Sequence, residues 1–230
     1  MKDDFKNIVS TDWLEQHLEA PDIRIIDSSW YFPQEKRNAE QEFLELHIPG
    51  ASFFDIDKIK DNHSDLPHML PPPEMFISSV RKLGIGDGHK VVIYDGLGMR
   101  SAARLWWMFK VFGYSDVVVL DGGFPKWVKE NRSITANLTE KEIRHLTIYE
   151  DKSIVADRDD VQRATKLNHC SIIDARSEGR FLGTEPEPRS GLRSGSIKNS
   201  INVPYETLLN EDFTFKKKQE ILDIFSQKGI

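Results

Sequence analysis

Short runs of apolar residues recur along this 230-residue chain, and each is long enough for one buried strand. The runs show no regular alternation with polar residues, so both faces of each strand are expected to be covered. This pattern is typical of a parallel sheet between two layers of helices. The runs are IRIID (23–27), VVIY (91–94), VVVL (117–120) and SIID (171–174).

Helical patterns lie between these runs, so the predicted fold class is α/β, with parallel sheets flanked by helices. The stretch STDWLEQHL begins with a capping residue at Ser10 or Thr11, and PPPEMFISSVRKLG predicts a helix that ends at Gly84. Residues 101–112, SAARLWWMFKVF, are apolar around most of a helical circumference. That helix is expected to be an internal packed element with its tryptophans in the core.

The chain also resembles itself at an offset of roughly 147 residues, which predicts two homologous halves. Ile25-Ile26-Asp27 lines up with Ile172-Ile173-Asp174, and HIPGAS (47–52) lines up with SIKNSI (196–201). We therefore expect a first domain over residues 1–135, a polar linker over 136–152, and an incomplete second domain over 153–230. Asp27 and Asp174, which end matching strands, are expected to brace the loops that follow them.

The stretch VVIYDGLGMRSAARLWW (91–107) reads as a buried strand, a tight glycine loop and the start of a helix. Such a loop presents backbone N–H groups and a helix N-terminus to an anion. The loop holds no nucleophile. Asp95 is at its start, where the negative charge of the side chain would occupy the anion site. The matching loop of the second half would fall at about position 240. We therefore expect the working copy to lie beyond residue 230, with roughly 50 residues missing and the chain itself inactive.

Composition narrows the function classes. The net charge of −6 and the pI near 5.7 argue against nucleic acid or an anionic membrane as the main partner. No apolar segment approaches the length of a membrane helix, and the N-terminal residues do not resemble a targeting signal. The one cysteine, Cys170, forms no internal disulfide, so a cytoplasmic location is expected.

Three separated motifs together resemble the tandem-domain rhodanese sulfurtransferases. They are FLELHIPGASFF (43–54), the stretch at 91–107 whose loop lacks a nucleophile, and VVVLDGGFPKW (117–127). The resemblance implies two rhodanese-like domains, of which the first is catalytically silent. The second would carry a persulfide-forming cysteine in a loop followed by a helix.

Two further motifs resemble the subclass that uses 3-mercaptopyruvate. In GRFLGTEPEPRSG (179–191), Arg180 and Arg189 match the arginines that hold the substrate's carboxylate and carbonyl, and arginine suits planar carboxylates. In residues 53–71, Asp57 and His68 match a carboxylate and a histidine that form a proton relay with a hydroxyl of the missing loop. The resemblance implies no cofactor and no metal.

The implied activity moves sulfane sulfur from 3-mercaptopyruvate, or from thiosulfate, to cyanide or to a thiol acceptor such as thioredoxin, through a cysteine persulfide. The cysteine thiolate would be stabilised by the N–H groups of its loop.

Several alternatives remain open from the residues alone. GLGMRS (96–101) nearly matches a dinucleotide-binding fingerprint, although Ser101 replaces its third glycine. Arg180 and Arg189 could pair with Glu185 and Glu187 instead of a substrate. A non-catalytic binding module is the third reading, because Cys170 precedes a predicted buried strand and is expected to be inert there.

Overall fold

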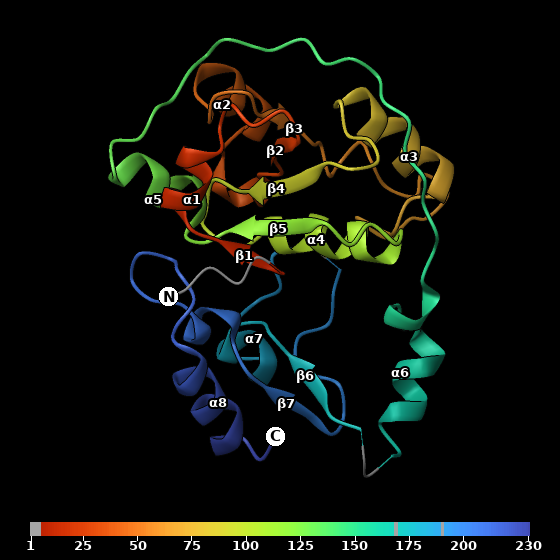
Figure 1. Cartoon of the computed structure of the whole chain (residues 1–230). Coiled ribbons are helices and arrows are strands. Elements are labelled where there is room, and N and C mark those ends of the chain that lie inside the picture. The colour runs from red at the N-terminus through yellow and green to blue at the C-terminus, as the bar shows by residue number, and fades with distance from the viewer. Residues whose placement is uncertain (1–5, 168–169, 190) are drawn as a thin grey trace. The chain divides into compact units, whose positions relative to one another are not determined.

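The computed structural model describes residues 6–167, 170–189 and 191–230, and its elements form two compact units (Figure 1). Unit 1 comprises the residues up to Asp151 together with Asp212–Thr214. Unit 2 comprises Lys152–Glu211 and Phe215–Ile230. Each unit has a parallel sheet of its own, which confirms the α/β class.

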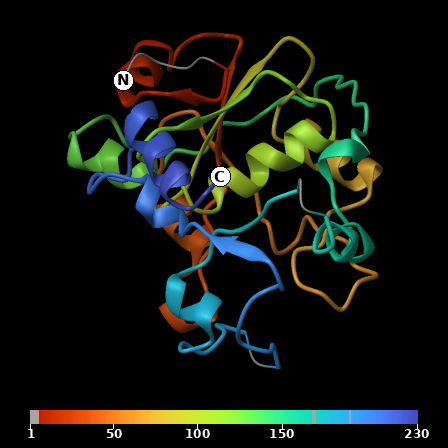
Figure 2. The ribbon, with the colours of Figure 1, turned by 90° about the horizontal axis from the view of Figure 1, so that it is seen from below.

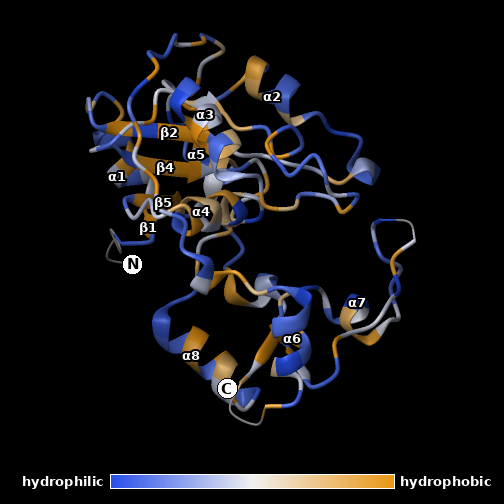
Figure 3. Cartoon of the chain, turned by 90° about the vertical axis from the view of Figure 1, so that its right-hand side faces the viewer, coloured by the Kyte–Doolittle hydropathy of each residue, from blue (hydrophilic) through white to orange (hydrophobic). Residues whose placement is uncertain are grey.

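Five parallel strands form the sheet of unit 1, in the order β1-β5-β4-β2-β3. Their bounds are Ile8–Val9 (β1), Ile23–Asp27 (β2), Ser52–Phe53 (β3), Lys90–Tyr94 (β4) and Val117–Leu120 (β5). Much of the three longer strands is orange in Figure 3, since most of their residues are hydrophobic. The predicted strands at 23–27, 91–94 and 117–120 are confirmed. β1 and β3 are too short to give a sequence pattern.

Helices cover both faces of this sheet. They are α1 (Thr11–Gln16), α2 (Ala39–Glu45), α3 (Pro73–Lys82), α4 (Ala102–Val111) and α5 (Gly123–Lys129), with a 3-10 turn at Pro33–Glu35. Leu14 of α1, Phe43 of α2 and Trp127 of α5 pack in one cluster with alternate strand residues such as Val92 and Tyr94. Val91 and Ile93 point to the opposite face because side chains alternate along a strand.

α4 lies on the second face and contacts β4 and β5; it is the yellow-green helix seen along its length in Figure 2. Phe109 packs edge-to-face on Phe76 of α3, with ring centroids 5.2 Å apart. Leu105, Met108 and Phe109 are buried, as an internal helix requires. The prediction that its tryptophans are core residues is wrong, because Trp106 and Trp107 are only half-buried and lie beneath the Lys110 and Arg104 side chains.

The segment 136–151, predicted to belong to a linker, contains no helix or strand but is tied to unit 1 along its length. Figure 1 shows it in green, running around the outside of that unit. Backbone and side-chain hydrogen bonds hold it, among them Lys141 Nζ to Gly50 O (2.9 Å), Arg81 Nε to Arg144 O (2.8 Å) and Tyr149 N to Phe112 O (3.1 Å). A Cβ on Gly113 would lie 2.4 Å from the Tyr149 carbonyl oxygen, so only glycine admits this close approach.

Unit 2 has two parallel strands, β6 (Ile172–Asp174) and β7 (Ser200–Asn202). Its helices are α6 (Arg158–Ala164), α7 (Glu178–Leu182) and α8 (Lys218–Gln227), with 3-10 turns at Lys152–Ile154 and Tyr205–Leu208. None of these helices has a buried residue, whereas every α-helix of unit 1 has at least one. Unit 2, in the part that the structure describes, therefore buries little apolar surface.

The two strand-ending aspartates brace their loops in the same way, as predicted. Asp27 Oδ1 accepts a hydrogen bond from Ser29 N at 2.8 Å, and Asp174 Oδ1 accepts one from Arg176 N at 3.0 Å. Each carboxylate thus bonds the N–H two residues ahead and turns the chain at the carboxyl end of its strand.

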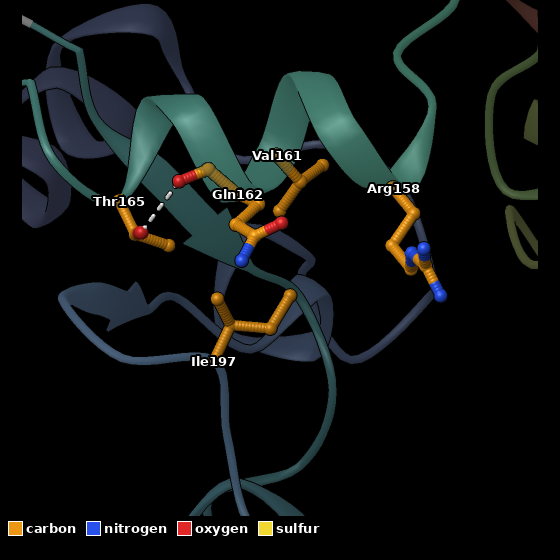
Figure 4. A pocket seen from close by; sticks show the side chains of 5 residues that line it. All are labelled: Arg158, Val161, Gln162, Thr165 and Ile197. Carbon is orange, nitrogen blue, oxygen red and sulfur yellow. Dashed lines mark hydrogen bonds between the residues drawn. The ribbon is translucent and has the colours of Figure 1, made fainter.

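An open groove of about 620 Å³ runs along α6 (Figure 4). Val161 and Gln162 of α6 and Thr165, which follows the helix, line the groove, and Ile197 faces them. The Thr165 hydroxyl donates to the Gln162 carbonyl at 2.8 Å, so its polar atom is directed along the helix rather than into the groove. None of the predicted site residues lines this groove.

Candidate functional site

The loop after β4 is an anion cradle, and the chain's own Asp95 fills it. The Asp95 side chain is fully buried. Its Oδ1 accepts from Leu97 N at 2.9 Å, and its Oδ2 accepts from Arg100 N at 2.7 Å and from Ala102 N at 2.8 Å. The predicted cradle is confirmed, and so is the expectation that Asp95 occupies it.

This geometry removes the physical basis for a dinucleotide at GLGMRS. A pyrophosphate would need the N–H groups that Asp95 already binds, and it would meet a buried carboxylate in their place. The loop therefore serves as a structural turn between β4 and α4.

A second carboxyl group lies close to this loop, at the end of β2. Asp27 is 5% exposed, and burial raises its pKa to about 7, with Asp95 adding to the increase. Together with Tyr31, Arg37 and Gly96 it lines a cavity of about 220 Å³. The Asp27 carboxyl group is therefore expected to take up its proton at a much higher pH than an exposed aspartate does.

Replacing Asp27 by asparagine is expected to flatten the dependence of stability on pH. Because the pKa is raised on folding, the native state binds this proton more tightly than the unfolded chain does. The stabilisation is complete below about pH 4 and is lost as the pH rises through about 7. Each pKa unit corresponds to about 1.4 kcal/mol, so the loss is on the order of a few kcal/mol.

Urea unfolding at pH 5 and pH 8 measures this effect. The wild type should lose more free energy of unfolding between the two values than Asp27→Asn, whose amide oxygen still accepts from Ser29 N. An equal loss in both proteins would show that Asp27 does not titrate in this range.

Asp57 and His68, the predicted relay pair, are in direct contact in unit 1. His68 Nε2 lies 2.6 Å from Asp57 Oδ1. The His68 side chain is 16% exposed and that of Asp57 is 59% exposed, so solvent reaches the pair mainly from the carboxylate side. The backbone N–H of Asp57 donates to Asp55 Oδ1 at 2.9 Å, which fixes the turn that carries the carboxylate.

The backbone of His68 adopts an unusual conformation, which neighbouring residues hold in place. Its φ angle is +56°, in the left-handed region that few residues other than glycine adopt. The guanidinium of Arg104, on α4, donates to the His68 carbonyl oxygen. Strained backbone of this kind tends to persist where the surroundings fix it, often at functional sites.

Arg180, in unit 2, lies on α7 and forms an ion pair with Glu187. Its Nη2 and Nε lie 2.6 and 3.2 Å from Glu187 Oε2, while Arg176 Nη1 lies 2.7 Å from Oε1 of the same carboxylate. The Glu187 side chain is 4% exposed, and the Arg180 guanidinium holds its pKa below the usual range. The ion pair left open by the sequence is therefore present for Arg180.

Arg189 is half-buried in the segment that follows this network. Glu185, the other acid considered as an arginine partner, accepts instead from the Ser177 hydroxyl at 2.8 Å. Arg180 and Arg189 belong to unit 2, and Asp57 and His68 to unit 1.

The strand that follows Cys170 is not buried, contrary to the sequence-based expectation. The thiol is exposed, and β6 begins two residues later. The prediction assumed a sheet covered on both faces, whereas Ile173 at the centre of β6 is 44% exposed. Apolar strand sequence alone does not bury a strand when the layers that cover it are incomplete.

Sequence reasoning missed two residues of these networks. Trp30 donates its indole N–H to Asp57 Oδ2 at 3.0 Å, and Arg176 joins the ion pair of Arg180 and Glu187. Arg176 follows the strand-ending Asp174 by two residues, and this spacing could have predicted its contact with that carboxylate. No comparable signal marks Trp30. Among the described residues, no group of three potential metal ligands is arranged around one point, and no helix is long and apolar enough to cross a membrane.

The sequence matches the family model of the rhodanese-like domain over residues 10–130. It is 38% identical over 232 residues to a 3-mercaptopyruvate sulfurtransferase of Rattus norvegicus, covering 98% of this chain and 78% of that protein. The chain belongs to the rhodanese family. A thiosulfate sulfurtransferase of Bos taurus is 39% identical over 233 residues, with the same two coverages.

A solved rhodanese structure has the same fold. SseA of Escherichia coli, described as a 3-mercaptopyruvate sulfotransferase, superposes with a TM-score of 0.88 at 37% identity, over 97% of this chain and 84% of that one. The rhodanese fold predicted from the motifs is thereby confirmed.

Proposed function

We propose that this rhodanese-family chain provides the donor-binding and proton-transfer residues of a sulfurtransferase that uses 3-mercaptopyruvate, or thiosulfate, as its sulfur donor. The observation that carries the proposal is the 2.6 Å contact between His68 and Asp57. A histidine bonded to a carboxylate is suited to proton transfer near neutral pH. The sulfurtransferase relatives support the enzyme class.

The proposed reaction begins when a cysteine thiolate attacks the sulfur of 3-mercaptopyruvate. A sulfur–sulfur bond forms and the substrate's carbon–sulfur bond breaks, so the electron pair leaves with pyruvate as its enolate. The enolate takes up a proton to give pyruvate, and the enzyme keeps a persulfide. A thiol such as that of thioredoxin, or cyanide, then accepts the outer sulfur. His68 and Asp57 serve the proton transfers. Arg180 and Arg189 hold the carboxylate and carbonyl, for which Arg180 must share or exchange its ion pair with Glu187.

We further propose that the sulfur-accepting thiol is not Cys170. In unit 1 the anion cradle follows β4, whereas Cys170 precedes β6 and lies outside any such loop. β6 and β7 pair as β2 and β3 do, and the described part of unit 2 contains no counterpart of β4 with its loop. The catalytic thiol is expected in such a loop, outside residues 1–230, so that this 230-residue chain alone forms no persulfide.

A non-catalytic binding module is the second candidate, favoured by one observation. The N–H cradle that follows β4, the central strand of unit 1, is filled by Asp95. If the protein expressed from its complete gene forms no persulfide with either donor, this second candidate replaces the first.

Replacing Arg189 by glycine tests the substrate assignment. We expect the KM for 3-mercaptopyruvate to rise by about tenfold or more, because a charge-assisted hydrogen bond contributes about 1.5–3 kcal/mol. Thiosulfate has no carboxylate, so its KM should change much less. Steady-state kinetics of the protein from its complete gene measure both donors. The control is Arg158→Gln, which removes an exposed arginine that pairs with Asp159 on α6.

Equal losses with 3-mercaptopyruvate and thiosulfate would contradict the assignment of Arg189 to the carboxylate. A loss of the same size in Arg158→Gln would show a general effect of charge.

A further inference from the structure

Trp30 contacts both members of the Asp57–His68 pair. Its indole N–H donates to Asp57 Oδ2 at 3.0 Å. Its ring also packs edge-to-face against the imidazole of His68, with centroids 4.9 Å apart and an interplanar angle of 85°. One side chain therefore constrains both the carboxylate and the imidazole.

The segment that carries Trp30 is itself firmly held. It directly follows β2, where Ser28 N donates to Tyr94 O at 3.0 Å and Ser29 N donates to Asp27 Oδ1 at 2.8 Å. Phe32 also packs against the indole, edge-to-face at 4.8 Å. Trp30 thus extends from the carboxyl edge of the central sheet to the relay pair.

The two hydrogen bonds to Asp57 divide its oxygens between two donors. Oδ1 accepts from His68 Nε2 and Oδ2 accepts from the indole of Trp30. A carboxylate that is 59% exposed would otherwise rotate among solvated orientations, and two donors at separate oxygens fix its plane. With the Nε2 proton directed at Oδ1, the basic nitrogen of the neutral ring is Nδ1.

We propose that Trp30 is a positioning residue for proton transfer, which fixes the plane of the Asp57 carboxylate and thereby the Nε2–H tautomer of His68. The inference rests on the proposed function only for its effect on catalysis. The tautomer itself is a property of unit 1 and is measurable without substrate.

The test compares Trp30→Phe with the wild type. Phenylalanine keeps an aromatic edge against His68 but removes the N–H donor. Nitrogen-15 chemical shifts of the neutral His68 ring are expected to show mainly the Nε2–H tautomer in the wild type and a mixture of tautomers in the variant. In the protein from its complete gene, kcat is expected to fall about tenfold, by analogy with the loss when hydrogen-bond partners of metal-binding histidines are removed, with KM within about twofold.

Two further variants keep the test informative. Trp30→Gln retains an N–H donor without the ring, and it should restore part of the Nε2–H population if the hydrogen bond is what matters. Trp13→Phe makes the same change on α1, where Trp13 stacks on His17 at 4.1 Å, and it should alter neither the His68 tautomer nor kcat.

An unchanged tautomer in Trp30→Phe would overturn the positioning role, as would a rise in KM at constant kcat. A changed tautomer with wild-type kcat would support the positioning of the pair and would instead contradict its proposed part in sulfur transfer.

Discussion

His68→Ala is expected to lower kcat for sulfur transfer from 3-mercaptopyruvate by about 10²–10⁴-fold, the usual contribution of a positioned general acid or base. The imidazole is bonded to Asp57 at 2.6 Å and only 16% exposed, so water would not replace it in the same geometry. Steady-state kinetics of the protein from its complete gene, with both donors and a thiol acceptor, measure the loss.

His145→Ala provides a matched control in the same unit. His145 also faces a carboxylate, with its Nδ1 3.2 Å from Asp87 Oδ2, but its side chain is 82% exposed on the segment 136–151. It should leave kcat close to the wild-type value. If the two histidine variants lose activity equally, or if His68→Ala keeps full activity, the proton-transfer role of His68 is wrong.

Asp95→Ala is expected to cost about 3–5 kcal/mol in free energy of unfolding, because hydrogen bonds to a charged group contribute about 1.5–3 kcal/mol each and the donors become unsatisfied. Three backbone N–H groups, those of Leu97, Arg100 and Ala102, depend on this fully buried carboxylate. Asp95→Asn keeps one acceptor oxygen and should lose an intermediate amount.

Urea unfolding of the 230-residue chain gives these differences. Asp116→Ala serves as the control, since its carboxylate is 54% exposed and its ion pair with Lys90 contributes about 1 kcal/mol at most. An Asp95→Ala protein as stable as Asp116→Ala would mean that the loop finds other acceptors and that the cradle does not need its aspartate.

The sequence was sufficient to predict those strands and turns that depend mainly on residues close together in the chain. Runs such as VVIY become central strands because nothing polar interrupts them, and the Asp95 loop follows from a glycine turn between a strand and a helix. Burial was harder to predict, because it depends on neighbouring layers. Cys170 and Ile173 read as core residues, yet Ile173, within the two-stranded sheet of unit 2, and Cys170, just before it, are both exposed.

In the candidate site, too, some features were predictable from the sequence and others were not. Asp57 and His68 were identified through family motifs, and their contact is present. The partners of Asp57 and His68 were not predictable, because they are distant in sequence. Arg104 is 36 residues from His68, and Trp30 is 27 residues from Asp57. Which arginine binds Glu187 depends on the turn after α7, which residue types alone do not determine.

The central claim is a sulfurtransferase whose persulfide forms on a cysteine other than Cys170. Intact-mass measurement of the protein from its complete gene, after incubation with 3-mercaptopyruvate and without an acceptor, tests this most directly. Cys170→Ser should gain one sulfur atom to the same extent as the wild type, while the 230-residue chain should gain none. A Cys170→Ser protein that gains no sulfur, or a 230-residue chain that carries a persulfide on Cys170, would contradict the account.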